Sequence, residues 1–281
     1  MGRTLLVTGT SRGLGRALAE TALAAGDRVV ATARDTNALR DLLERYPETA
    51  CAVPLDVTDA QAARDAVDFA VESFGRLDVV INNAGYSDIA ALEDTSLDDF
   101  RAQLETNLWG AIHVTKAALP LLRAQRGGHV VQISSVSGRL APLAGLGPYV
   151  TAKFALEGFS EALALEVAPF GVKVTIVEAG SMATSLYSAM TVSTPSPPYA
   201  DALAPMLGRH SSPAARERGV RPRRAAEVVL SVLDLADPPL WLPLSGEAVD
   251  HIRRADQRKL AELDRWERLS RSADTEAPDG S

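Results

Sequence analysis

The sequence has little of what builds a disulfide framework, a metal centre or a membrane span. Its one cysteine, Cys51, excludes an internal disulfide and a zinc site made of several cysteines. The four histidines, at positions 113, 129, 210 and 251, do not have the spacing of metal ligands. No apolar run reaches the roughly 18 residues of a membrane helix, and no signal peptide precedes the first strand-like run. We therefore expect a cytoplasmic protein that binds neither a metal nor a membrane.

Lysine is also scarce, and basic residues are fewer than acidic residues. Only four of the 29 basic residues are lysines, at positions 116, 153, 173 and 259, so each one stands out in an arginine-rich chain. The 36 acidic residues give a net charge of −7 and a pI near 5.2, which argues against a nucleic-acid binder. With 46% apolar residues, the 281-residue chain has the composition of a globular protein of one or two domains.

The chain alternates apolar strand-like runs with amphipathic helix-like segments. The predicted strands are 4–8, 28–33, 51–57, 77–81, 129–134, 173–177 and 240–244. The predicted helices are 14–25, 36–46, 59–74, 96–123, 148–167, 224–235 and 247–271, and Pro120 offers an earlier end to the fourth of them. Repeated βα units predict an α/β fold with a doubly wound, Rossmann-like parallel sheet in three layers. We assign residues 1–271 to one domain and expect 272–281 to be a disordered tail.

The segment 180–222 breaks this rhythm, because it has little periodicity and is rich in proline, serine and alanine. A connection of this length inside a domain is usually a lid or a binding loop. We expect it to cover the substrate, with apolar contacts from Met182, Tyr187 and Met190. Five arginines flank Gly219, and we interpret them as a solvated hinge rather than a site for an acidic substrate: Arg216, Arg218, Arg221, Arg223 and Arg224.

A glycine-rich turn joins the first predicted strand to the first predicted helix. Glycines allow sharp turns and a close approach of the backbone to a pyrophosphate, while the following helix N-terminus offers free N–H groups. The spacing is G-x-x-x-G-x-G rather than the G-x-G-x-x-G of the standard dinucleotide fingerprint. The candidate cofactor residues here are Gly9, Ser11, Arg12, Gly13, Leu14 and Gly15.

The end of the second predicted strand indicates which dinucleotide would bind. An acidic residue there would bind the ribose hydroxyls of NAD, but the chain has Ala33 followed by Arg34. Arginine grips a 2′-phosphate bidentately, and Arg12 could act as a second clamp, so we predict NADP(H). A register slip of two residues would instead bring Asp35 to the ribose.

Tyr149 and Lys153 are four residues apart in a predicted helix and therefore lie on the same face. A lysine ammonium near a phenol lowers the pKa of the phenol, which makes it a usable acid or base near neutral pH. Strand five ends in Ser134-Ser135, with Ser137 close behind, at the sheet edge where ligands bind.

Together these motifs resemble those of the short-chain dehydrogenase/reductase family, in its small single-domain group. The matching elements, in the family's order over about residues 3–245, are TGxxxGxG at 8–15, Asn82-Asn83-Ala84-Gly85, Asn107, a serine after strand five and YxxxK. Two departures stand out. The spacing from Ser135 to Tyr149 is one residue longer than usual in the family, which leaves Ser134 and Ser137 as alternatives, and Ala179 replaces the usual proline.

The resemblance implies a role for each matching residue. Tyr149 would exchange the proton with the substrate oxygen, Lys153 would hold the nicotinamide ribose and lower the pKa of Tyr149, and Ser135 would hydrogen-bond the same oxygen. Asn107 would hold a water in a proton relay to Lys153. Further cofactor contacts would come from Asp56, Val57, Asn83, Ala84, Gly85, Gly180, Met182 and Thr184. A homodimer or homotetramer is also implied, with the helices at 96–123 and 148–167 as its interface.

We therefore expect an NADPH-dependent reductase of a ketone or aldehyde, which in reverse is an alcohol dehydrogenase. The alternatives are an epimerase or dehydratase that retains NADP, and a dinucleotide-binding sensor without turnover. The sparsely charged lid before Asp201 favours a medium-sized, mostly apolar substrate.

Overall fold

The computed structural model describes residues 2–183, 190–212 and 219–274. Seven parallel strands form one sheet in the order β3-β2-β1-β4-β5-β6-β7. Their bounds are β1 Thr4–Val7, β2 Arg28–Ala33, β3 Ala50–Pro54, β4 Val79–Asn82, β5 Gly128–Ile133, β6 Val172–Ala179 and β7 Trp241–Leu244. The chain starts in the middle of the sheet, builds outward to β3, and then returns to build outward to β7. This order confirms the predicted doubly wound, Rossmann-like α/β fold.

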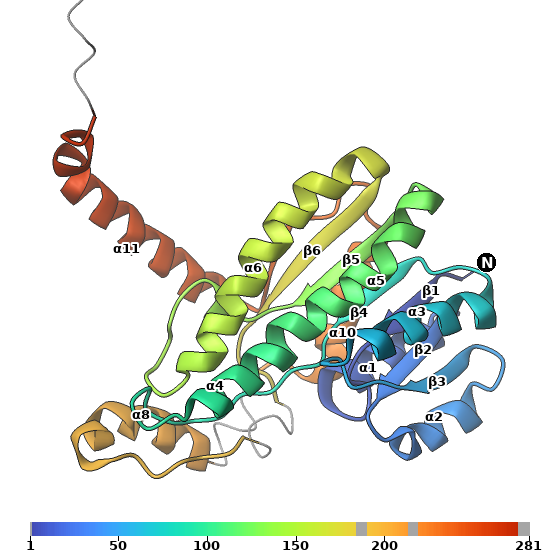
Figure 1. Ribbon diagram of the computed structural model, residues 1–281, viewed down its shortest axis with the longest axis horizontal. Coiled ribbons are helices and arrows are strands. Elements are labelled where there is room, and N and C mark those ends of the chain that lie inside the picture. Colours follow the sequence, from blue (N-terminus) through green and yellow to red (C-terminus); the bar gives the residue numbers. More distant parts are fainter. Residues whose placement is uncertain (1, 184–189, 213–218, 275–281) are drawn as a thin grey trace, which may run out of the picture.

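Helices cover both faces of the sheet because the side chains of each strand alternate between them (Figure 1). Leu5 and Val7 of β1 pack toward one helical layer, and Leu6 packs toward the other. The first layer contains α1 (Gly13–Ala24), α2 (Arg40–Arg45) and α10 (Pro222–Ser231), and the second contains α3 (Ala60–Phe74), α5 (Gly110–Gln125) and α6 (Gly147–Val167). Every βα crossover therefore opens at the same sheet edge, where the carboxyl ends of the strands meet.

The long helix predicted at 96–123 consists of three successive pieces. They are α4 (Leu97–Leu104), a π turn η2 (Glu105–Trp109) and α5, with the Ser96 hydroxyl capping the start by accepting from the Asp99 N–H at 3.0 Å. Pro120 does not end the helix, which continues to Gln125. Proline removes the hydrogen bond to Lys116, and both residues lie on the exposed side of the helix, where water can replace it.

The expectation that 180–222 lacks regular structure is wrong in its second half. A short 3-10 turn η5 (Pro197–Tyr199) leads into helix α8 (Ala200–Ser211), and α10 already begins at Pro222. Pro205 and Gly208 inside α8 obscure its pattern in the sequence, yet Leu203 and Met206 form a buried stripe three residues apart. The predicted contacts Thr184 and Tyr187, and the arginines 216 and 218, lie outside the described residues.

Helix α11 (Gly246–Arg271) begins on the body and then extends away from it (Figure 1). Ala248 and Ile252 pack against Val136, so the first turns belong to the core. Beyond Asp256 the apolar side chains of α11 are exposed, at Leu260, Leu263, Trp266 and Leu269. No helix among the described residues combines the length and apolar character needed to cross a membrane. Most of the predicted tail, from residue 275 onward, lies outside the described residues.

Candidate active site

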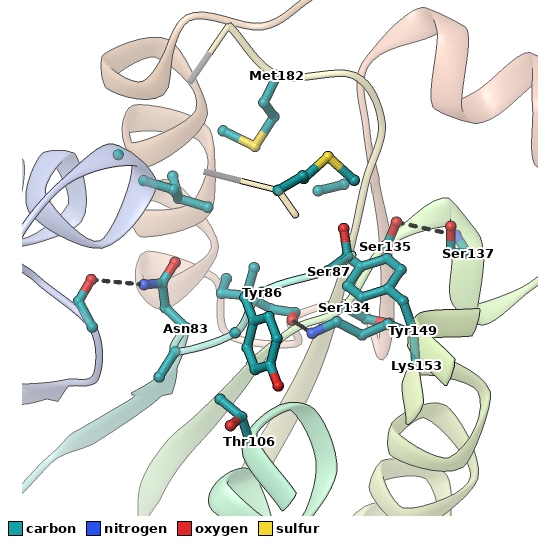
Figure 2. A pocket seen from close by; sticks show the side chains of 18 of the residues that line it. Asn83, Tyr86, Ser87, Thr106, Ser134, Ser135, Ser137, Tyr149, Lys153 and Met182 are labelled. Carbon is teal, nitrogen blue, oxygen red and sulfur yellow. Dashed lines mark hydrogen bonds between the residues drawn. The ribbon is translucent and has the colours of Figure 1, made fainter. Parts of the chain in front are cut away.

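A cavity of about 460 Å³ opens at the carboxyl edge of the sheet. It runs from the turn after β1, past the ends of β4 and β5, to the start of α11, and Figure 2 shows its central part. Most of the predicted site residues line it: Gly9, Ser11, Arg12, Gly13, Leu14, Arg34, Asp56, Val57, Asn83, Ala84, Gly85, Ser135, Tyr149, Lys153, Gly180 and Met182. The structure thus brings together residues that are up to 173 positions apart in the chain.

The glycine turn shapes one end of this cavity. Gly9 and Gly13 have φ angles of +71° and +62°, which side-chain-bearing residues rarely adopt. Gly15 does not line the cavity, and a Cβ there would lie 2.3 Å from the Gly9 carbonyl oxygen. The absence of a side chain at Gly15 therefore allows α1 to pack closely under the turn.

The N-terminus of α1 remains open toward the cavity. Arg12 occupies its N-cap position without a side-chain cap, and no acidic residue lies in the first turn. The first N–H groups and the positive end of the helix dipole are therefore available to an anion. This donor set fits the pyrophosphate of a dinucleotide.

Asn83 braces the turn from the neighbouring strand. Its amide nitrogen donates to the carbonyl oxygens of Thr8 at 2.8 Å and Gly9 at 3.2 Å. The Thr8 hydroxyl in turn accepts from the backbone N–H groups of Asn83 and Ala84. Asn83 lines the cavity, as expected of a cofactor contact, and together with Thr8, the first residue of the TGxxxGxG motif, it joins the ends of β1 and β4.

At the adenosine end of the cavity, β2 ends at Ala33 and places the exposed Arg34 on the rim. In the part of the chain that the structure describes, Arg34 has no ion pair. Asp35 does not line the cavity, because its carboxylate caps the next turn by accepting from the Asn37 backbone and side chain, both at 2.9 Å. Asp56 lines the cavity and also holds a turn, as it accepts from Thr58.

Tyr149 and Lys153 rise from the first turns of α6 toward the end of β5 (Figure 2). The Lys153 ammonium lies 5.7 Å from the centre of the Tyr149 ring and donates to the Ile133 carbonyl oxygen at 2.9 Å. Lys153 is only 5% exposed, and burial lowers its pKa to about 8, against an opposing effect of Glu157. The charged and neutral forms of Lys153 are therefore both accessible near physiological pH.

The three candidate serines differ in their hydrogen bonds. Ser135 lines the cavity and accepts from the Ser137 backbone N–H at 3.1 Å, and among the described residues its hydroxyl hydrogen has no acceptor. Ser134 and Ser137 also line the cavity, but the Ser134 hydroxyl donates to Glu157 at 2.5 Å. Figure 2 shows Ser135 and Ser137 beside the Tyr149 ring.

Asn107 lies behind the cavity wall, in the π turn η2, and does not line the cavity. Its amide hydrogens are both engaged, with the carbonyl oxygens of Tyr86 at 2.8 Å and Gln103 at 2.9 Å. A Cβ on Gly85 would lie 2.6 Å from the Asn107 side-chain oxygen and 3.8 Å from the Lys153 nitrogen, so these groups are close neighbours. The side-chain amide thus anchors the segment that faces Lys153.

Behind the serines lies a buried acidic pair that sequence reasoning missed. Glu157 on α6 and Glu178 on β6 each have one buried carboxylate oxygen without a hydrogen-bond partner. Burial raises the pKa of Glu157 to about 7, and burial also raises the pKa of Glu178. Arg139 contacts Glu178 at 3.2 Å and Asp256 of α11 at 2.8 Å. The sequence does not single out Glu157, because α6 also carries Glu161 and Glu166, and the only signal was Glu178 near the end of the mostly apolar β6.

The opposite side of the cavity is mostly apolar. It is lined by Pro142, Leu143 and Leu146 before α6, and by Met182, Met190 and Met206 from the segment after β6. One polar cluster interrupts it, in which Arg209 of α8 lies 3.7 Å from Glu247 of α11 and hydrogen-bonds Ser181. This cluster fastens α8 to the start of α11.

Comparison with known proteins agrees with this geometry. A family model described as short chain dehydrogenase matches residues 3–193. Oxidoreductase BOA17 of Botryotinia fuckeliana is 44% identical over 96% of this chain and 98% of its own length. A short-chain dehydrogenase from Streptomyces avermitilis has a crystal structure that matches with a TM-score of 0.89 at 40% identity, covering 97% of this chain and 98% of its own.

The same fold also occurs with either nicotinamide dinucleotide bound. A Burkholderia phymatum protein in complex with NAD is 23% identical over 92% of this chain and 95% of its own, with a TM-score of 0.80. A Burkholderia cenocepacia protein in complex with NADP is 24% identical over 94% and 97%, with a TM-score of 0.75. From the matched family model and the length of the alignments, the chain belongs to the short-chain dehydrogenase/reductase family and is an oxidoreductase.

Proposed function

We propose that this protein is an NADP(H)-dependent reductase of a ketone or aldehyde, which in reverse oxidises the corresponding alcohol. One observation carries the proposal: Ser135, Tyr149 and Lys153 line the same cavity as an open helix N-terminus. A bound nicotinamide dinucleotide would supply or accept the hydride.

The cofactor choice rests on the two arginines at the adenosine end. Arg12 and Arg34 both line the cavity, and the nearest acidic alternative, Asp35, is engaged as a turn cap. A guanidinium without a carboxylate partner is well suited to a 2′-phosphate, since it can donate two parallel hydrogen bonds. Leu14, Asp56, Val57, Ala84 and Gly85 would complete the contacts, with Gly180 and Met182 toward the nicotinamide.

The proton would come from Tyr149. Its phenol lies beside the Lys153 ammonium, and a nearby positive charge favours phenolate, so proton exchange with a substrate oxygen becomes feasible near neutral pH. Ser135 has a free hydroxyl hydrogen to donate to the same oxygen. Asn107, which anchors the segment facing Lys153, would keep the relay to Lys153 in place.

Exposed apolar side chains on α4, η2 and α6 support a homo-oligomer, and we retain the expectation of a cytoplasmic location. Leu97 of α4, Trp109 of η2, and Phe154 and Leu165 of α6 are 70%, 46%, 42% and 81% exposed. Such side chains on neighbouring helices are typical of a surface that a second copy covers. Light scattering after size exclusion would give the mass of the assembly.

A carbonyl panel tests the enzymatic proposal directly. Purified protein is incubated with aliphatic and aryl ketones and aldehydes, and the absorbance of NADPH or NADH is followed. We expect turnover with NADPH and little with NADH. Conversion of an alcohol substrate without net cofactor consumption would indicate an epimerase or dehydratase instead, and binding of NADPH without any turnover would indicate a sensor.

A further inference from the structure

A second cavity, of about 570 Å³, lies directly beside the candidate active site. Its floor is formed by Leu140, Ala141 and Pro142, and its wall by His251, Arg254, Gln257, Arg258 and Ala261 of α11. Pro142 and His251 line both cavities, so the second cavity is adjacent to the candidate active site.

The wall of this second cavity is basic. His251, Arg254 and Arg258 are spaced i, i+3 and i+7 along α11, and they therefore share one face of the helix. Among the residues that the structure describes, neither Arg254 nor Arg258 has an ion-pair partner. The chain as a whole carries a net charge of −7, so this patch has the opposite sign to the protein's net charge.

Three acidic residues near this face are paired with other arginines, and Glu262, four residues beyond Arg258, accepts from the Trp266 indole N–H. Glu247 lies 3.7 Å from Arg209, and Asp250 lies 3.5 Å from Arg253. Asp256 forms an ion pair with Arg139 at 2.8 Å, and Arg139 also contacts Glu178 of the buried acidic pair. The two guanidinium groups of the second cavity thus remain available to an anion that comes from outside the protein.

The floor of this cavity comes from the segment between the catalytic serine and tyrosine. That segment, 136–148, contains the one residue by which the Ser135–Tyr149 spacing exceeds the family's usual spacing. It supplies Leu140 to Pro142 on one side of the opening and Leu143 and Leu146 to the catalytic cavity on the other. Apolar side chains of this one segment therefore line both cavities, between Tyr149 and the arginines.

We propose that Arg254 and Arg258 form a subsite for the anionic end of an elongated substrate, whose carbonyl lies at Tyr149 and whose apolar middle passes Leu143 and Pro142. The inference rests on the proposed function and refines its substrate class, from a mostly apolar carbonyl compound to an oxo acid. Two arginines recognise a carboxylate through charge-assisted hydrogen bonds, while an uncharged end group would leave them in water.

The test compares ω-oxo acids of increasing chain length with their methyl esters, using NADPH at low salt. We expect kcat/KM for the acid to exceed that for the ester by about tenfold at the best chain length, and the advantage to shrink as salt is added. In the variant R254Q/R258Q the advantage should disappear while the ester rate stays unchanged. The control R253Q/R268Q removes the same charge from α11 outside both cavities, and it should keep the advantage.

Equal kcat/KM values for acid and ester in the unmodified protein would overturn the subsite. So would a loss of the acid advantage in the control that matches the loss in R254Q/R258Q. If no carbonyl compound is reduced, the proposed function fails, and calorimetry then tests the subsite alone. Decanoate should bind about tenfold more tightly than decanamide, with and without NADP⁺, and only R254Q/R258Q should abolish the difference; equal binding of the two ligands would refute the subsite.

Discussion

The two sides of the cavity are built in different ways. On the wall made by β5 and α6, polar side chains are buried and bonded to one another, as with Lys153 and the Ile133 carbonyl or Ser134 and Glu157. On the wall made by α8 and α11, polar side chains such as Arg209 and Glu247 are partly exposed and joined by a surface ion pair. Buried bonds fix positions, whereas exposed ion pairs contribute little and are screened by salt. The difference supports our proposal that the first wall carries the chemistry and that the second contacts the substrate.

The largest effect should follow from Tyr149→Phe, which removes one hydroxyl from the rigid wall. We expect kcat to fall by about 10³-fold or more, because general acid–base catalysis contributes roughly 10²–10⁴-fold. The dissociation constant of NADPH, measured by fluorescence titration, should change by less than about threefold.

The matched control is Tyr199→Phe, which removes an exposed phenol that donates to Glu93 outside the cavity. Its kcat should match that of the unmodified protein. If Tyr149→Phe also retains full turnover, the assignment of the chemistry to this wall is wrong.

Ser135→Ala should give the next largest effect. Removing a donor to the substrate oxygen typically costs about 10²-fold in kcat. Ser134→Ala should reduce kcat far less, since its hydroxyl is committed to Glu157, but it should lower the melting temperature. Steady-state kinetics and thermal unfolding of the two variants, with Ser137→Ala as a third, separate the alternatives. A larger loss of kcat in Ser134→Ala than in Ser135→Ala would reverse the assignment.

The sequence predicted those parts of the structure that depend on neighbouring residues, and it missed those that depend on packing between distant elements. Strand periodicity predicted the sheet, and local spacings, such as four residues between Tyr149 and Lys153, predicted which residues line the candidate catalytic wall. These relations are set by one or two neighbouring elements. Glu157 and Glu178 were missed because their proximity depends on packing α6 against β6. Helix α8 was missed because Pro205 interrupts a pattern of only two buried apolar residues. The packing of Gly15 against the Gly9 carbonyl was not predicted, because it depends on how α1 lies under the turn.

A smaller effect is expected from Arg34→Asp at the adenosine end. The variant replaces an exposed guanidinium on the cavity rim with a carboxylate, which would repel a 2′-phosphate and could accept from ribose hydroxyls. We expect the ratio of kcat/KM for NADPH to that for NADH to fall by about 10- to 100-fold. Arg40→Asp, a charge change on exposed α2 outside the cavity, is the control. Equal losses with both cofactors in Arg34→Asp would contradict the NADP(H) proposal.

The smallest effect concerns the stability of the fold. It tests whether the buried carboxyl group of Glu157 is protonated near neutral pH in the folded protein. The pKa of Glu157 is raised to about 7 by burial, from an ordinary value near 4.5. Between these values the folded protein holds a proton that the unfolded chain has released, so its free energy of unfolding falls as the pH rises. The glutamine side chain in Glu157→Gln is neutral at every pH, so the free energy of unfolding of this variant should not fall for this reason.

We therefore measure the free energy of unfolding with urea at pH 5 and at pH 8. Between these two pH values, the free energy of unfolding of Glu157→Gln should rise by on the order of 2 kcal/mol relative to that of the unmodified protein. The polar and charged groups that face Glu157 are Ser134, Lys153, Glu161, Glu178 and Arg139. The substitution also changes the pKa values of the titratable groups among them, and the measured difference includes this change. His129, whose pKa burial lowers to about 4, has the opposite pH dependence, but it acts in both proteins and cancels from the difference. Glu166→Gln, on the exposed side of the same helix, should show no pH-dependent gain. If the unfolding free energies of the unmodified protein and Glu157→Gln change in parallel with pH, the wall holds no such proton, and its rigidity must come from packing alone.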